Sequence, residues 1–332
     1  MSTQVPNATP DTGSSRTDVL PGPRWLPSSP RAASLRVFAW LSFIAEVVIV
    51  GTGGAVRLTG SGLGCPTWPT CTADSLVPTA ELSFHSLIEF GNRMMSGVVG
   101  ILALVVLILV WRLRRQRREL FVLAWIVVGG VIAEALVGGL TVRTGLNPAI
   151  VGFHYVASVV LVCVAAAFLA RLYAVPGPRE RAVPRWFAIL THVTTLVLAV
   201  VVIMGVLTTA SGPHSGDAEV VRQGFDAAVL AHIHSLPAYL LAALVLVLTV
   251  GAWALRLPPA RWLTALVVVI AVQIVVGIVQ ARDGLPPALV GVHMVLAALL
   301  SATMTVTVLS LKRPAGGVVS ASAPERETAG AA

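Results

Sequence analysis

The hydrophobic positions of this chain fall into eight long apolar segments separated by short polar stretches. A helix of about 20 apolar residues is long enough to cross the hydrocarbon core of a bilayer, which is about 30 Å thick. Within lipid, each backbone polar group of a single segment finds its partner only if that segment is a helix. The sequence therefore predicts an all-α integral membrane protein, with eight transmembrane helices over about residues 37–56, 86–111, 121–142, 149–173, 186–209, 227–255, 262–281 and 288–311.

The two ends of the chain lack this apolar pattern. Residues 1–33 are rich in Ser, Thr, Pro and Arg, and residues 314–332 are rich in Ala, Gly and Ser. Segments of this kind bury too little apolar surface to fold by themselves. The first segment also lacks the apolar core and the cleavage site of a signal peptide. We expect both ends to be disordered tails on the cytoplasmic side.

Composition supports lipid as the main solvent of this protein. Hydrophobic residues make up 56% of the chain and charged residues only 11%, with a mean hydropathy of +0.86. A soluble domain carries roughly 25% charged residues. The net charge of +8 does not indicate nucleic-acid binding, because the basic residues lie between the apolar segments, where they are typical of cytoplasmic loops.

The basic residues also predict an orientation. They gather in the N-terminal segment, in every even-numbered loop and after the last apolar segment, whereas the odd-numbered loops carry only isolated arginines. Cytoplasmic loops have an excess of Lys and Arg. We therefore expect a protein of the cell membrane with both termini in the cytoplasm. The residues concerned are Arg16, Arg24, Arg31, Arg36, Arg112, Arg114, Arg115, Arg117, Arg118, Arg171, Arg179, Arg181, Arg185, Arg256, Arg261, Lys312 and Arg313.

The chain contains an internal repeat with a shift of 139 residues. Between Gly138–His154 and Gly277–His293, nine of 17 positions are identical, including an Arg, a Pro and a His at fixed spacing. We interpret the protein as two tandem pseudo-symmetric four-helix bundles, residues 34–174 and 175–313. Both halves start on the cytoplasmic side, so the repeat is parallel.

The repeat histidines His154 and His293 are the strongest candidates for chemistry. Each follows the start of its helix by about five residues, which at about 1.5 Å per residue puts it about 8 Å below the outer surface. A polar side chain at this depth is costly and indicates function. Neutral imidazole is a good iron ligand, and six-coordinate haem takes two axial ligands from facing helices. The alternative is a hydrogen bond to a neighbouring helix.

Further polar residues lie at the starts of the second and sixth helices. His234 is the predicted partner of His293, and His232 points to the opposite side as a hydrogen-bond partner or a substitute ligand. In the second helix His85, Glu89 and Asn92 share one face. A carboxyl group among apolar residues is expensive to ionise, so Glu89 is a candidate proton carrier or polar anchor.

Arginines and cysteines lie near the predicted outer surface. Arg57, Arg143 and Arg282 are at outer helix ends, where they are candidate partners for haem propionates through paired hydrogen bonds. Ordinary interfacial arginines would occupy the same places. Cys65 and Cys71 lie in the first outer loop, in a compartment that permits disulfides, as a structural link or a redox-labile pair.

Three stretches resemble the haem A synthase family. They are the loop motif Gly51–Cys71, the segment Ile88–Arg93 and the helix-start histidines. The resemblance covers about residues 35–312. It implies an oxidoreductase that converts the C8 methyl group of haem O to the formyl group of haem A by successive hydroxylations in the membrane.

The resemblance also implies roles for single residues. In the C-terminal half, His234 and His293 would hold haem b as a cofactor. In the N-terminal half, His154 would bind the iron of the substrate haem O, and Glu89 would be essential for the reaction. Cys65 and Cys71 match the paired cysteines of many members.

One position departs from the family pattern, because this chain has Asn92 where many members have histidine. An amide does not replace imidazole as an iron ligand. The iron of the substrate haem is then bound by His154 alone, or His85 supplies the second ligand from the same helix face. We favour His85 for that reason.

The expected partners are haem O, membrane lipid, a haem O synthase that supplies the substrate, an electron donor, and a second copy in a homo-oligomer; no nucleic acid is expected. The main alternative function is a di-haem b electron-transfer membrane cytochrome, which would use the same histidine pairs. A secondary transporter fits the repeat, but transporters place their polar groups at the midplane. A structural membrane protein without catalysis is the third alternative.

Overall fold

The computed structural model describes residues 30–79, 84–212, 216 and 226–315. The predicted tails therefore lie mostly outside the described residues, except that residues 30–33 begin the first helix. The eight predicted transmembrane helices are confirmed, and each is long and apolar enough to cross a membrane. They are α1 (Pro30–Leu58), α2 (Phe84–Trp111), α3 (Arg118–Arg143), α4 (Pro148–Leu172), α5 (Arg185–Ser211), α6 (Ala227–Ala254), α7 (Ala260–Arg282) and α8 (Pro287–Leu309).

The repeat extends to the backbone of the turns before α4 and α8. Gly145 and Leu146 both have positive φ angles of 60° and 57°, and Gly284 and Leu285 repeat this with 74° and 63°. In both turns the leucine amide donates to a helix carbonyl at 2.8 Å. Each following helix starts with a proline at its first position, where the missing N–H costs nothing. The same local sequence therefore gives the same entry into α4 and α8.

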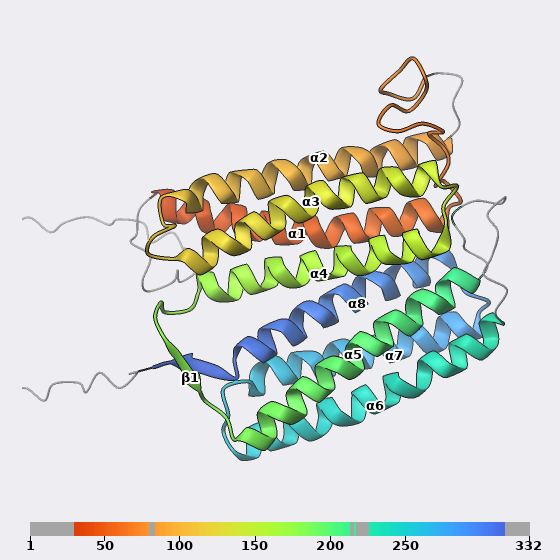
Figure 1. The fold of residues 1–332 in the computed structure, drawn as a ribbon. Helices are drawn as coiled ribbons and strands as arrows, with labels where there is room; N and C mark the ends of the chain where they lie inside the picture. The colour runs from red at the N-terminus through yellow and green to blue at the C-terminus, as the bar shows by residue number, and fades with distance from the viewer. Residues whose placement is uncertain (1–29, 80–83, 213–215, 217–225, 316–332) are drawn as a thin grey trace, which may run out of the picture.

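The helices pack as two groups of four, α1–α4 and α5–α8, as Figure 1 shows. Each half has its own apolar core. A third cluster joins the halves where α1, α4 and α8 meet, and it is built from Val and Ala side chains, which let helices approach closely in lipid. Many large apolar side chains on the outer faces of the helices stay exposed, as expected for surfaces that contact lipid tails.

The two repeats meet at equivalent surfaces. The hydroxyl group of Tyr155 on α4 donates to the backbone carbonyl of Met294 on α8 at 3.0 Å, and these two residues are 139 positions apart. That separation equals the repeat shift found in the sequence. The seam between the halves therefore passes next to both repeat histidines, His154 and His293.

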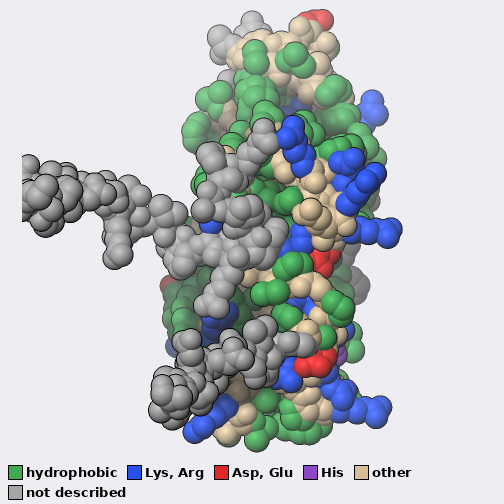
Figure 2. Space-filling model, turned by 90° about the vertical axis from the view of Figure 1, so that its left-hand side faces the viewer, with side chains coloured by type: hydrophobic (Ala, Val, Ile, Leu, Met, Phe, Trp, Pro, Cys, Tyr) green, Lys and Arg blue, Asp and Glu red, His purple; other side chains and the backbone are tan. Residues whose placement is uncertain are grey.

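The start of α1 and the end of α8 lie at the same end of the helical bundle (Figure 1). There the strand β1 (Arg179–Arg181), in the link between the halves, pairs antiparallel with β2 (Lys312–Pro314) after the last helix. This two-stranded ribbon is the one addition to the all-α prediction among the described residues. Figure 2 views this end and shows Lys and Arg side chains spread over it, which agrees with the basic loops predicted to face the cytoplasm.

Candidate functional site

A cavity of about 390 Å³ opens inside the N-terminal half, near the end opposite to the β-ribbon. This volume lies in the range of about 300–1,000 Å³ that is usual for ligand pockets. The walls come mainly from α1, α2, α3 and α4 and the first loop, and the C-terminal half contributes Gly216 and Met294. Most of the lining is apolar, and the polar side chains that reach it are Glu46, Arg57, Glu89, Asn92, Ser96, Arg93, Glu134, Thr141, His154, Tyr155 and Ser158.

Glu89 connects the cavity to the loop that covers it. Its side chain is buried, and its Oε2 atom accepts a hydrogen bond from the amide of Cys65 at 2.7 Å. Its Oε1 atom forms an ion pair with Arg93, one helical turn later on α2, at 2.5 Å. In this structure Glu89 therefore acts as a polar anchor between α2 and the first loop. Its carboxylate also lines the cavity, as a proton carrier would.

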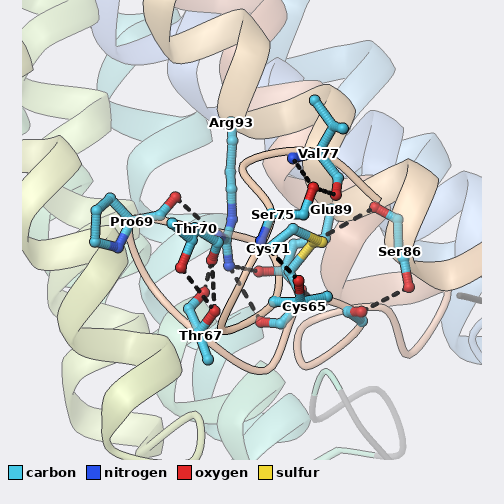
Figure 3. Close-up of a disulfide and its surroundings, with 12 residues drawn as sticks. Cys65, Thr67, Pro69, Thr70, Cys71, Ser75, Val77, Ser86, Glu89 and Arg93 are labelled. Carbon is cyan, nitrogen blue, oxygen red and sulfur yellow. Dashed lines mark hydrogen bonds and ion pairs between the residues drawn. A yellow bond between two sulfur atoms is a disulfide. The ribbon is translucent and has the colours of Figure 1, made fainter. Parts of the chain in front are cut away.

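The first loop borders the cavity through Trp68 and Pro69, and we call it the roof. Figure 3 shows its disulfide and the hydrogen bonds that hold it to α2. Its predicted disulfide between Cys65 and Cys71 is confirmed. The guanidinium group of Arg93 reaches into the loop and donates to four backbone carbonyl oxygens, at distances of 2.9–3.5 Å. The side chains of Trp68 and Pro69 then line the cavity from above.

The roof approaches α3 so closely that only glycine fits beneath it. A Cβ atom added at Gly139 would collide with the ring of Trp68. The neighbouring Gly138 leaves room for the ring of His154, whose nearest atom would lie 3.5 Å from an added Cβ atom. Two adjacent glycines thus bring the roof and the candidate iron ligand against the same stretch of α3.

Glycines mark four equivalent positions in the two halves. Gly138 faces His154 between α3 and α4, and Gly277 faces His293 between α7 and α8. Gly205 faces His234 between α5 and α6. Its counterpart between α1 and α2 is Gly53, which faces the amide of Asn92.

Asn92 therefore occupies the fourth position of a set that otherwise consists of histidines. Its amide oxygen accepts a hydrogen bond from the hydroxyl of Thr52 at 2.7 Å, and it lines the cavity together with His154.

His85, favoured by the sequence as the substitute ligand, lies elsewhere. Its side chain is exposed and its Nδ1 atom is 2.9 Å from the hydroxyl of Ser61 in the loop. It is not among the residues that line the cavity. A shared helix face did not bring it there, because His85 lies about two turns before Asn92, at the very start of α2. Its role as a ligand stays a prediction that this geometry does not favour.

The predicted arginines divide into two kinds. Arg57 lines the cavity and donates to the backbone carbonyl of Thr209 on α5 at 2.8 Å. Arg143 and Arg282 are exposed at the ends of α3 and α7, outside the cavity lining. Of the three, Arg57 is therefore the one placed to meet a ligand in the cavity.

Two carboxylates that line the cavity were not singled out from the sequence. Glu46 on α1 is only 2% exposed. Glu134 on α3 has its Oε2 atom 3.0 Å from the Nδ1 atom of His154. Both lie inside long apolar segments, and a charge within such a segment is itself a signal of function.

In the C-terminal half the predicted pair His234 and His293 comes together. The two ring centroids are 6.3 Å apart and the ring planes are inclined by 69°. Both Nδ1 atoms are buried. His232, on the opposite side of α6, is exposed.

This pair fits the axial ligands of a haem. A metal–imidazole bond is about 2 Å long and the ring centre lies about 1 Å behind the nitrogen, so two rings on one metal have centroids about 6 Å apart. Gly205 and Gly277 let the two rings pack close to α5 and α7, since an added Cβ atom would lie 3.1 Å and 3.3 Å from the Cε1 atoms of His234 and His293. The donor set of two neutral imidazoles from facing helices is also one that iron in haem accepts.

The sequence of this chain is similar to a known protein family. Residues 36–305 match the COX15-CtaA family, described as cytochrome oxidase assembly protein. The chain belongs to this family. The match covers most of both COX15-CtaA halves, from α1 into α8.

Individual COX15-CtaA relatives match over a shorter region. A protein from Listeria welshimeri named "Heme A synthase" is 36% identical over 139 residues, which are 42% of this chain and 45% of that protein. A Bacillus cereus protein of the same name is 38% identical over 124 residues, 36% of this chain and 39% of that protein. The alignments thus span less than half the length of the relatives.

Proposed function

We propose that this protein is a haem A synthase, an oxidoreductase that converts the C8 methyl group of haem O to a formyl group. Two successive hydroxylations of the methyl carbon give a geminal diol, which loses water. The observation that carries the proposal is the asymmetry of the site: one half has a roofed cavity with a single histidine and carboxylates, and the other has two histidines facing each other. The names of the relatives support the same reaction.

In this proposal residues 34–174 form the substrate half. His154 binds the iron of haem O from α4, while Asn92 on the opposite wall leaves the other side of the iron without a protein ligand. The apolar lining accepts the macrocycle and its lipophilic tail. Arg57, as a cation on the cavity wall, pairs with a carboxylate of the haem.

Glu89 is the residue to which we assign proton transfer. It lines the cavity, it is buried, and its Oε1 atom is paired with Arg93. A general acid or base must lie next to the reacting group and away from bulk water. Trp68 and Pro69 of the disulfide loop cover part of the cavity.

Residues 175–313 form the half that holds the resident cofactor, haem b, between His234 and His293. When bound there, haem b supplies a one-electron carrier. The short distance between the two rings supports this assignment.

The proposal also includes location and partners. We infer a protein of the cell membrane with both termini in the cytoplasm, because the Lys and Arg residues gather at the end of the bundle where α1 begins and α8 ends. Its partners would be a haem O synthase, an electron donor, membrane lipid and a second copy of the chain.

The test is expression together with a haem O synthase in a host that makes no haem A, followed by chromatography of the extracted haems. We expect haem A beside haem b. The variant His154→Ala, made at the same expression level, should yield haem O but no haem A. Extracts from folded wild-type protein without haem A or hydroxylated haem O would refute the proposal. Such extracts with haem b alone would favour the di-haem b electron-transfer cytochrome.

A further inference from the structure

The histidine of the substrate half has a carboxylate behind it. The Oε2 atom of Glu134 on α3 lies 3.0 Å from the Nδ1 atom of His154 on α4. The hydroxyl of Ser158 donates to the same oxygen at 2.5 Å and also contacts the backbone carbonyl of His154 at 3.0 Å. These three residues all line the cavity, so the arrangement is part of the site.

The repeat shows that this carboxylate is particular to one half. The residue 139 positions after Glu134 is Gln273, and the residue 139 positions after Ser158 is Ala297. The side-chain amide of Gln273 donates to the backbone carbonyl of His293 at 3.0 Å, not to the ring. The two halves thus keep a polar residue at the same place and use it differently.

The two atoms lie 3.0 Å apart here without the geometry of a hydrogen bond. We propose that Glu134 is a positioning residue that accepts a hydrogen bond from the Nδ1–H group of His154 once the ring binds the substrate iron, and so presents the Nε2 atom to that iron. This inference rests on the proposed function. A carboxylate that accepts the second ring N–H of a metal-bound histidine fixes its tautomer and ring orientation and makes it a stronger donor. Ser158 holds the carboxylate in place.

The contact between Glu134 and His154 compensates for the absence of a histidine at position 92. With an amide on the opposite wall, the substrate iron depends on one protein ligand. A stronger donor on that side compensates for the missing second ligand. In the other half two imidazoles share the iron, and a glutamine at the equivalent position is sufficient.

A second carboxylate provides the matched control. Glu46 lines the same cavity from α1 and is buried, with its Oε1 atom making no hydrogen bond to the described residues. Replacing it with glutamine removes a second carboxyl group from the same cavity. Only Glu134 contacts the His154 ring, so the two variants separate a specific contact from a general effect of charge.

The experiment titrates haem into the purified full-length protein and records the iron–imidazole stretching band of the ferrous form. The haem between His234 and His293 has two ligands and does not contribute this band, so the band reports His154. In Glu134→Gln we expect the band at lower frequency, a more positive reduction potential of the same haem, and affinity weakened by about 10- to 100-fold.

The control variants should behave differently. Glu46→Gln should leave the band at its wild-type frequency. Glu134→Asp, which keeps a carboxylate, should restore part of the shift. Gln273→Glu should leave the band unchanged and move the potential of the other haem to more negative values.

The outcomes are distinct. A wild-type band in Glu134→Gln, or an equal shift in Glu46→Gln, would overturn the role of Glu134. A wild-type protein with the band but without haem A formation would refute the proposed function and leave the Glu134 result standing. If wild-type protein gives no band that His154→Ala removes, the inference about Glu134 fails together with His154 as a ligand.

Discussion

The two halves of this protein have the same helical frame but differ in what they place inside it. The C-terminal half brings His234 and His293 face to face, with their ring centroids 6.3 Å apart. The N-terminal half has Asn92 where the other three glycine-facing side chains are histidines, and it adds the carboxylates of Glu46 and Glu134 around a roofed cavity. If the proposed function holds, the repeat keeps one helical frame for a flat group, and a few polar substitutions distinguish the site that retains its ligand from the site that transforms it.

The largest effect should come from removing a ligand in the C-terminal half. His293→Ala leaves His234 as the single protein ligand, so we expect loss of the resident haem and no detectable haem A formation. Absorption spectra of purified protein measure the haem content. His232→Ala, on the exposed side of α6, is the matched control and should retain the haem. Full haem content in His293→Ala would disprove the assignment of the two halves.

The next effect concerns the acid of the N-terminal half. Glu89→Ala should leave the C-terminal haem bound and reduce haem A formation by about 10²- to 10⁴-fold, the usual contribution of a general acid or base. The variant Glu89→Gln separates two roles, because a side-chain amide oxygen still accepts from the Cys65 amide but does not carry the proton. Wild-type rates in Glu89→Gln would leave only the anchoring role. Glu180→Gln, in the exposed ribbon, controls for loss of a charge.

A third experiment makes the halves more alike. Asn92→His restores a second imidazole opposite His154, at a position where Gly53 leaves space. We expect the haem of the N-terminal half to become six-coordinate, seen as a low-spin absorption spectrum, and to bind more tightly. If the spectrum stayed that of a five-coordinate haem, position 92 would not be equivalent to the histidine positions of the C-terminal half. His85→Ala should leave the spectrum unchanged, because its ring lies outside the cavity lining.

A smaller effect is expected from the disulfide. Cys65→Ser opens a short loop, since the two cysteines are six positions apart, and the lost loop-closure entropy corresponds to about 2 kcal/mol. Arg93 still holds the loop, so the rate of haem A formation should fall by less than about tenfold. A tenfold fall corresponds to about 1.4 kcal/mol of activation free energy. Activity assays with and without reductant measure it. Cys71→Ser and the double variant should match Cys65→Ser; an additional loss in the double variant would indicate separate roles for the thiols.

The smallest effect should come from the arginines at the outer helix ends. Arg143→Ala and Arg282→Ala remove exposed side chains, and surface changes of this kind alter stability by less than about 0.5 kcal/mol. Haem affinity should stay within about twofold of wild type. Arg57→Ala, which removes a cation from the cavity wall, should weaken binding of the substrate haem measurably more. An equal loss of haem affinity in all three variants would show that Arg143 and Arg282 also bind the haem propionates.

The sequence predicted the helices well because each is a long apolar segment, and lipid leaves such a segment a single conformation. It also predicted which histidines share a site in the C-terminal half, because the repeat and the helix periodicity both constrain His234 and His293. Glu134 was missed although it lies in an apolar segment, since its importance depends on the neighbouring helix. The equivalence of Asn92 to the ligand histidines likewise depends on which glycine faces it.

The prediction for His85 had the right helix face but did not account for its depth along the helix. Its spacing from Glu89 and Asn92 correctly describes one face of α2, but a face extends along the whole helix while the cavity ends below the roof. The position of that end is set by the first loop and by contacts with Ser61 and Trp68. Periodicity gives the direction of a side chain and not its depth relative to a folded loop.

The bonding of Arg93 has a consequence for how the roof tolerates change. Its donors reach the carbonyl oxygens of Cys65, Thr67, Pro69 and Thr70, and every amino acid carries such an oxygen. These hydrogen bonds therefore depend on the path of the loop backbone and not on the side chains at the four positions. Arginine itself is much harder to exchange, because lysine offers a single ammonium point in place of a planar fork of five donors. The backbone of the loop is thus fixed to α2 by a single side chain, so that replacing Arg93 would release four loop carbonyl groups at once.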